Sequence, residues 1–412
     1  MGLSILNRSR HKKWEVDYES IGYLLLYLML LSLSVFYLQH IFGRLILGYH
    51  KPAPKKMPTL PLRFNQDGQF KILQVADMHY ANGAVTSCED VFPSQFHSCS
   101  DLNTSAFLNR MIQYEKPDFI VFTGDNIYGP DSADAADSMD AAFAPAVKSK
   151  IAWAAVLGNH DQESTMTREE LMSYISVMDY SISQVNPLWN NHNTSQRQRF
   201  GQINGFGNYN IEVKGAFGSE FENVSIFNLY FLDSGDRSVV PGIPGYGWIK
   251  ESQLTWLQDV SAVLQDANRV GPETQSNLAP ALAFFHIPLP EVRHFRASGI
   301  VGEKQEQVGC ASVNSGVLNT FIHSGDVKAA FVGHDHVNDF CGKTEGIWLC
   351  YGGGFGYHAY GKAGWSRRAR VIMANLEKGQ KMWQGVTDIR TWKRLDDEEL
   401  TKINEQLLWS KQ

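Results

Sequence analysis

Residues 332–339 read V-G-H-D-H-V-N-D and carry the most informative local pattern of the chain. The apolar residues 329–332 predict a strand that ends at a glycine, after which His334 and His336 follow two positions apart. Side chains at i and i+2 of an extended segment point the same way, so the two imidazoles can converge on one point. Neutral histidine is a common ligand of zinc, iron and manganese, but most H-x-H pairs are surface histidines. A metal site is therefore predicted only if other segments supply partners.

Four further predicted strands end in the same manner. They cover residues 70–75, 119–122, 151–157 and 281–285, and the residues that follow them are Asp77 and His79, Asp125, Asn159 and His160, and His286. One such end is weak evidence, because Asp and Asn are ordinary turn residues. Five ends of this kind favour a shared site, since ligand sites of layered α/β proteins gather at the carboxyl ends of strands. The pattern predicts one site that draws side chains from all five strand ends.

Helical segments alternate with these strands, which indicates a layered fold. The predicted helices cover residues 101–115, 133–148, 167–178 and 251–263. Additional strands are predicted over residues 224–233, 348–351 and 370–375, with loops and an edge hairpin over residues 187–218. The apolar residues Ile403, Leu407 and Leu408 predict a last helix over residues 396–409.

Composition limits the class of partner. The 412 residues carry a net charge of −6, which gives no global basic surface and argues against nucleic acid as a partner. The five cysteines are too few for a disulfide scaffold. Two short-range pairings are one hypothesis, Cys88 with Cys99 and Cys341 with Cys350, which leaves Cys310 unpaired. Five buried, reduced thiols are an alternative that the composition supports equally well.

The N-terminal region predicts a membrane anchor. Residues 1–20 form a polar, basic tail, residues 21–43 a transmembrane signal-anchor and residues 44–66 a Pro- and Lys-rich linker. The core of this segment is uncharged and just long enough to cross a bilayer as a helix, and no small-x-small cleavage site follows it. A buried helix of a soluble protein is the alternative, which apolar residues on all faces disfavour.

The orientation of the anchor is not decided by charge, because basic residues lie on both sides of it. Glycosylation sequons at Asn103, Asn193 and Asn223 and the proposed disulfides favour a lumenal or extracellular domain in the secretory pathway. Three sequons are also roughly what chance gives in a chain of this composition. We therefore expect a single-pass membrane protein whose globular domain lies on the lumenal side.

The strand-end motifs resemble those of the calcineurin-like metallophosphoesterases. In chain order they are D-M-H at 77–79, G-D-N at 124–126, G-N-H-D at 158–161, His286, and G-H-D-H at 333–336. The longer segments F-T-G-D-N-I-Y, F-V-G-H-D-H-V-N-D-F-C-G and C-Y-G-G-G-F-G-Y-H-A-Y-G-K-A-G-W are similar to a plant-type, purple-acid-phosphatase-like branch that is often labelled probable inactive. The resemblance implies an α+β fold, a four-layer α/β/β/α sandwich over residues 67–385. The transmembrane helix would precede it, and a helical tail over residues 386–412 would follow.

The resemblance also implies a role for each matched residue. The first metal ion would be held by Asp77, His79 and His336, the second by Asn159, His286 and His334, and Asp125 would bridge both. Asp335 faces away from the site by strand alternation. Two divalent or trivalent ions of iron, zinc or manganese suit such ligands, and the residues do not choose among them.

Two residues of the G-N-H-D motif are expected to be catalytic. His160 would stabilise the transition state or protonate the leaving oxygen, and Asp161 would orient its imidazole. Capping of the next helix is an equally weighted alternative for Asp161.

The chain departs from the purple branch in an informative way. Purple enzymes have glycine where His79 stands, and a tyrosine three residues after the bridging Asp binds iron. This chain has both His79 and Tyr128, so Tyr128 is not expected to be a ligand and the protein is not expected to be purple. Every residue that the general mechanism needs is present, and we therefore expect activity. The glycine-rich residues 352–361 either shape a substrate pocket or form a bulged turn.

The predicted function is binuclear-metal-dependent hydrolysis of phosphoric esters, with phosphomonoesters favoured, by a metal-activated hydroxide. A phosphodiesterase on the same centre and a catalytically silent metal-binding scaffold are the alternatives. The expected substrates are phosphorylated small molecules or phosphoproteins, and the N-terminal helix is the expected contact with a membrane.

Overall fold

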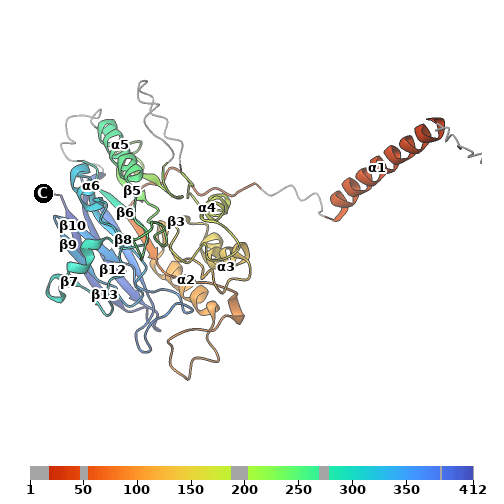
Figure 1. Cartoon of the computed structure of the whole chain (residues 1–412). Helices are drawn as coiled ribbons and strands as arrows, with labels where there is room; N and C mark the ends of the chain where they lie inside the picture. The colour runs from red at the N-terminus through yellow and green to blue at the C-terminus, as the bar shows by residue number, and fades with distance from the viewer. Residues whose placement is uncertain (1–17, 47–53, 187–202, 269–277, 381–382, 412) are drawn as a thin grey trace, which may run out of the picture. The chain divides into compact units, whose positions relative to one another are not determined.

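The computed structural model describes residues 18–46, 54–186, 203–268, 278–380 and 383–411. The chain divides into two compact units, Met1–Pro54 and Lys55–Gln412 (Figure 1). The predicted N-terminal tail up to residue 17, part of the predicted linker and Asn193 lie outside the described residues.

The first unit contains one long helix, α1 (Tyr18–Ile46). Its apolar window Gly22–Gln39 has 18 residues, none of which is buried. At 1.5 Å per residue this window is roughly 27 Å long, close to the ~30 Å hydrocarbon core of a bilayer. The helix is therefore long and apolar enough to span a membrane, and it includes the predicted span at residues 21–43.

The second unit is built on two β-sheets that face each other. The first has the order β13-β12-β11-β1-β2-β3 and the second the order β4-β5-β6-β8-β10-β9-β7. The first comprises β1 (Gln69–Val75), β2 (Phe119–Thr123), β3 (Ala152–Val156), β11 (Arg368–Lys378), β12 (Trp383–Leu395) and β13 (Lys402–Ser410). The second comprises β4 (Tyr209–Lys214), β5 (Ser225–Phe231), β6 (Ala281–Phe284), β7 (Ile300–Val301), β8 (Val327–Val332), β9 (Cys341–Thr344) and β10 (Ile347–Tyr351).

Each sheet has a parallel centre. Strands β1, β2 and β3 are parallel to one another, as are β5, β6, β8 and β10. Parallel strands bring their carboxyl ends to the same edge of a sheet, which is where the predicted site residues follow. Antiparallel strands flank both centres. Of the region predicted to form loops and an edge hairpin, residues 187–202 lie outside the described residues; β4 is an edge strand within it, but its partner is β5, which was predicted as a separate strand.

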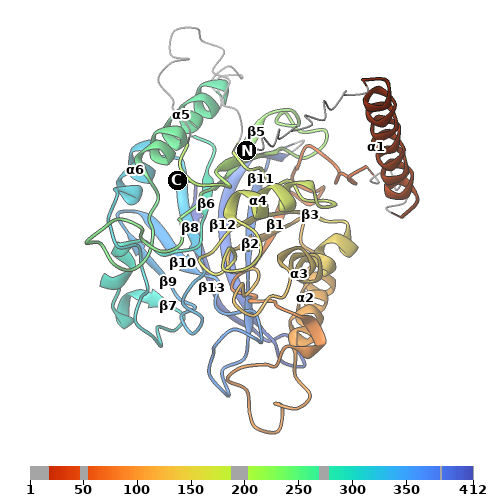
Figure 2. The same cartoon turned by 45° about the vertical axis from the view of Figure 1, so that its right-hand side comes forward.

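Helices cover the outer faces of the two sheets (Figure 2). On the first sheet these are α2 (Asp101–Glu115), α3 (Ala135–Ser149) and α4 (Arg168–Val177); on the second they are α5 (Glu251–Asn268) and α6 (Val317–Ser324). Successive side chains of a buried strand point to opposite faces of the sheet and so enter two different cores. Phe331 of β8 lies in the core between the sheets, and Val332 lies in the core under α5 and α6. The expected α/β/β/α layering is confirmed.

The prediction of a C-terminal helix over residues 396–409 is wrong. These residues include β13, which pairs antiparallel with β12, so the predicted helical tail at 386–412 is part of the first sheet. Ile403, Leu407 and Leu408 suit either secondary structure, but pairing with β12 satisfies the backbone polar groups and buries Leu408. The compact unit also extends N-terminally of the predicted boundary at residue 67, because Leu62 and Phe64 lie in the core.

Candidate metal centre

The strand ends turn sharply at four of the predicted ligands. Asp77, His79, Asp125 and His334 have φ values of 57°, 46°, 47° and 82°. Left-handed backbone is uncommon for residues other than glycine, and it persists only where the surroundings hold it in place. These turns direct the side chains into the space between the loops instead of continuing the strands.

Glycines allow the loops to approach one another closely. A Cβ atom on Gly158 would lie 2.1 Å from Oδ1 of Asp125, and one on Gly356 would lie 1.8 Å from the carbonyl oxygen of Met78. The backbone N–H of Gly356 donates to the carbonyl of Asp77 at 3.0 Å, and that of Gly354 donates to the carbonyl of His336 at 2.9 Å. These two glycines of the 352–361 segment therefore support the backbone on which the ligands are mounted.

The strand ends form two adjoining groups of potential ligand atoms. One comprises Asp77, His79, Asp125 and His336, the other Asp125, His286 and His334, and within each group the ligand atoms lie within 4.8 Å of one another. All are buried. Oδ2 of Asp125 lies 3.2 Å from Nε2 of His79 and also 3.2 Å from Nε2 of His286. One carboxylate oxygen is therefore shared between the two groups.

Asn159 joins the second group. Its side-chain oxygen lies 3.2 Å from Nε2 of His286, and the residue is fully buried. The structure thus brings together all seven residues that the sequence nominates as metal ligands. Asp335 faces away from them, as predicted, because Tyr351 donates to its carboxylate at 2.5 Å.

Backbone carbonyls fix the orientation of two of the imidazoles. Nδ1 of His286 lies 2.9 Å from the carbonyl oxygen of Thr123, and Nδ1 of His336 lies 2.8 Å from that of Tyr360. A carbonyl oxygen only accepts, so each Nδ1 is the donor and each Nε2 is left with a lone pair facing the site. This is the tautomer that a metal ion requires.

The donor set fits two metal ions. Burial raises the pKa of the Asp77 carboxyl well above its usual value, and its Oδ2 has no hydrogen-bond partner among the described residues. Burial also opposes ionisation of Asp125, but His286 and His79 hold the pKa of that carboxyl well below its usual range. A buried carboxylate oxygen without a partner is costly, and a cation at this point would satisfy it. Mixed carboxylate, amide and imidazole ligands suit iron, zinc or manganese.

His160 lies beside this centre and is paired with Glu163. The backbone N–H of His160 donates to Oδ1 of Asp125 at 2.8 Å, and its Nδ1 lies 2.5 Å from Oε2 of Glu163. The side chain of His160 is 22% exposed, so it can reach a substrate. Sequence analysis missed Glu163, although it stands three residues after His160 in H-D-Q-E.

The predicted role of Asp161 as the partner of the His160 imidazole is wrong. Its carboxylate accepts hydrogen bonds from the backbone N–H groups of Asn126, Ile127 and Gly158, at 2.9, 3.0 and 2.7 Å. The alternative of a helix cap is also wrong, because Thr167 caps α4. Asp161 instead ties the loop after β3 to the loop after β2.

A second anchor of the loop after β3 was not predicted. Arg168, at the start of α4, donates to the carbonyl of Gly158 at 2.5 Å and pairs with Asp233 at 2.5 Å. Asp233 follows β5 and is buried, so this ion pair joins the two halves of the site. The partners are 65 positions apart in the sequence, so no local pattern indicates their contact.

Three tyrosines surround the ligand imidazoles. The ring of Tyr128 stacks on His79 with centroids 5.3 Å apart, and that of Tyr360 stacks on His336 at 3.8 Å. Tyr246 meets the ring of His334 edge-on at 4.3 Å. That Tyr128 is not a metal ligand stays a prediction.

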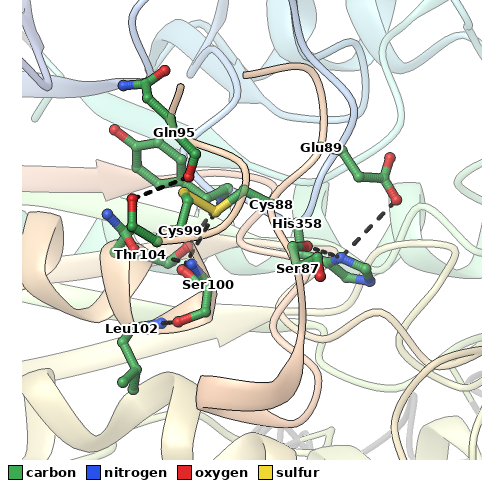
Figure 3. The surroundings of a disulfide bond; sticks show 12 residues. Ser87, Cys88, Glu89, Gln95, Cys99, Ser100, Leu102, Thr104 and His358 are labelled. Atoms are coloured by element: carbon green, nitrogen blue, oxygen red, sulfur yellow. Dashed lines mark hydrogen bonds and ion pairs between the residues drawn. A yellow bond between two sulfur atoms is a disulfide. The ribbon is translucent and has the colours of Figure 1, made fainter. Parts of the chain in front are cut away.

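Both disulfides of the sequence hypothesis are present, and Cys310 is free and buried. Figure 3 shows the Cys88–Cys99 bond beside His358, whose Nδ1 lies 2.9 Å from the carbonyl oxygen of Ser87. The ring of His358 in turn contacts that of Tyr128, with centroids 5.5 Å apart. The disulfide therefore lies in the segment that supports one wall of the site.

Two helix-covered sheets with paired ligand clusters at their strand ends define the architecture of a metal-dependent phosphoesterase. The family model for calcineurin-like phosphoesterase matches residues 70–338, and the chain belongs to this family.

The chain is similar to two plant proteins and, more distantly, to a solved structure from a fish. It is 54% identical over 385 residues to "Probable inactive purple acid phosphatase 28" of Arabidopsis thaliana, covering 93% of this chain and 95% of the relative. It is 55% identical over 361 residues to "Probable inactive purple acid phosphatase 29" of the same plant, covering 87% and 90%. The crystal structure of a dimetal phosphatase from Danio rerio is 16% identical with a TM-score of 0.49, covering 83% of this chain and 99% of that one.

Proposed function

We propose that this chain hydrolyses phosphoric monoesters at a binuclear metal centre. The observation that carries the proposal is the position of Asp125, whose Oδ2 lies 3.2 Å from an imidazole nitrogen of each ligand group. A shared carboxylate of this kind is what two adjacent metal ions require. Membership of the calcineurin-like phosphoesterase family supports phosphoric esters as the substrate class.

The ligands divide between the two ions. The first is assigned to Asp77, His79 and His336, the second to Asn159, His286 and His334, with Asp125 shared. When bound, such ions polarise phosphoryl oxygens and lower the pKa of water, which is the chemistry that ester hydrolysis needs at neutral pH.

His160 acts as the proton donor to the leaving oxygen. Glu163 holds Nδ1, which leaves Nε2 for the substrate. The backbone bond from His160 to Asp125 fixes the distance between this imidazole and the shared carboxylate. Phosphorylated small molecules and phosphoproteins are the substrates we propose, and the net charge of −6 argues against nucleic acid.

The names of the plant relatives contain the word "inactive", which is a statement about those proteins. This chain retains the seven proposed ligands and His160. A metal-binding scaffold without turnover would need none of the contacts that hold His160. A diesterase remains the second candidate, since the same ligands serve both ester classes.

Hydrolysis of aryl phosphates by the full-length chain in detergent, loaded with manganese, zinc or iron, tests the proposal. We expect turnover of an aryl phosphate monoester above that of the matched diester. Asp125→Asn and His160→Ala should each lower kcat by about 100-fold or more. The exposed His323→Ala of α6 is the matched control. Unchanged rates in both site variants would refute the assignment.

A further inference from the structure

The loop after β5 brings a second feature to the rim of the metal centre. Residues 236–247 fold back as a narrow hairpin in which Ser238 N–H donates to the Gly245 carbonyl and Gly247 N–H to the Asp236 carbonyl, both at 2.8 Å. Arg237 and Tyr246 are directly opposed across this hairpin. Their side chains therefore have a fixed relative position.

Tyr246 connects the hairpin to the centre. Its ring meets that of His334 edge-on, with centroids 4.3 Å apart and planes at 87°. Its carbonyl oxygen accepts from the backbone N–H of Ser312 at 3.3 Å, so the residue is held from the side away from Arg237 as well. Tyr246 is thus a fixed platform whose ring directly contacts a proposed metal ligand.

Arg237 lies on this platform. Its guanidinium carbon is 4.8 Å from the centroid of the Tyr246 ring, a cation–π contact. The side chain is exposed, and in the described part of the chain no carboxylate forms an ion pair with it. The neighbouring Asp236 carboxylate is engaged by the side chain of Gln162. Arg168, another arginine near the site, pairs with Asp233.

An exposed guanidinium that pairs with no carboxylate among the described residues, held at the rim of a metal centre, has a specific chemical use. Its planar donors match two oxygens of a phosphate group, and stacking on an aromatic ring leaves these donors free. The pre-set position reduces the side-chain entropy that is lost when a ligand binds.

We propose that Arg237, positioned by Tyr246, binds non-bridging oxygens of the substrate's phosphate and thereby selects dianionic monoesters over diesters. This inference rests on the proposed function and deepens it. A monoester phosphate offers Arg237 three terminal oxygens and nearly two charges, whereas a diester offers two oxygens and one charge. Arg237 is then the residue that separates the two ester classes on one metal centre.

The test compares variants of the two hairpin residues by steady-state kinetics on the metal-loaded, full-length chain. Loss of a charge-assisted hydrogen bond predicts that Arg237→Ala raises KM for an aryl phosphate monoester about tenfold or more. Its kcat/KM for the matched diester should fall by a smaller factor, because the diester carries less charge, so the monoester preference falls. Arg237→Lys keeps the charge but not the planar fork and should give an intermediate value.

The Tyr246 variants distinguish the role of the aromatic ring from that of the hydroxyl group. Tyr246→Phe keeps the ring and should behave like wild type, whereas Tyr246→Leu should reproduce Arg237→Ala with unchanged metal content. Arg296→Ala removes another exposed arginine and is the matched control. Wild-type monoester preference in Arg237→Ala would overturn the inference and leave the proposed function standing.

Binding of inorganic phosphate, measured by titration calorimetry, provides a readout that does not need turnover. Phosphate affinity should fall about tenfold or more in Arg237→Ala. If the wild-type chain proves inactive, this measurement still decides the inference: a weakened affinity supports it and an equal affinity contradicts it.

Discussion

The imidazole of His160 is paired with Glu163, with 2.5 Å between Nδ1 and Oε2. Both residues lie in the loop after β3 that also supplies Asn159, and the backbone of His160 is bonded to Asp125. One loop therefore carries a proposed ligand, the proposed proton donor and the residue that orients this donor. Arg168 binds the carbonyl of Gly158 in the same loop, and Asp161 ties the loop to the backbone of Asn126 and Ile127.

Glu163→Gln should lower kcat about tenfold while the metal content stays at the wild-type level, because a neutral amide orients the imidazole less firmly and does not stabilise its charged form. Rates of aryl phosphate hydrolysis and metal analysis of the same samples measure this. Glu169→Gln, an exposed change in the first turn of α4, is the control. A wild-type kcat in Glu163→Gln would show that the pairing has no role in turnover.

A buried ion network supports the loop that carries His334 and His336. The carboxylate of Asp339 pairs with Arg368 at 2.6 Å and with Lys393 at 2.7 Å, and all three residues are buried. Arg370 donates to the carbonyl of Asp339 at 2.8 Å. These contacts join the metal-binding loop to β11 and β12 of the first sheet.

Asp339→Asn should lower the free energy of unfolding by about 3–5 kcal/mol at pH 7, because it removes the carboxylate that faces two buried cations. Denaturant unfolding of wild type and variant measures this. The exposed Asp137→Asn of α3 is the control and should change stability by less than ~0.5 kcal/mol.

The loss of unfolding free energy in Asp339→Asn should depend on pH. Burial raises the pKa of Asp339, but Lys393 and Arg368 outweigh this and hold it below its usual value. A carboxyl whose pKa is lowered by folding stabilises the protein above its unfolded pKa of about 4 and loses this effect as the pH falls further. The difference between wild type and variant should therefore shrink as the pH falls below ~4. A difference that grows on acidification would contradict the network as described.

We propose that α1 anchors the protein and that the second unit lies on the lumenal side. The full-length chain should then stay with membranes after alkaline carbonate extraction. The exposed Asn223 should carry a glycan, so Asn223→Gln should remove a mobility shift that endoglycosidase also removes. The absence of any such shift in the wild type would argue against the lumenal placement.

The local sequence was sufficient to select the residues that we propose as metal ligands. Each of them follows a strand within four residues, and the run of apolar residues before Asp77, Asp125 or His334 marks the strand end without tertiary information. The disulfide pairings were also correct, since both close short loops.

The directions in which loop side chains point, and the pairing of segments that are distant in the sequence, were not predictable in the same way. Asp161 is next to His160 in sequence, but the loop points its carboxylate at the backbone of residues 126–127 and points Glu163 at the imidazole. The last strand, β13, has apolar residues that suit a helix equally well, and only its pairing with β12 decides. The contact of Arg168 with Asp233 and that of Asp339 with Lys393 join distant segments.

Metal content per chain is the decisive measurement for a binuclear centre. The full-length protein is loaded with manganese, zinc or iron, desalted and analysed by mass spectrometry of the elements, alongside Asp125→Asn and the control Asp137→Asn. Because one oxygen of Asp125 serves both ligand groups, we expect two ions per wild-type chain and per control chain, and one or fewer in Asp125→Asn. Fewer than one ion in the wild type, or two in Asp125→Asn, would contradict a binuclear centre built on Asp125.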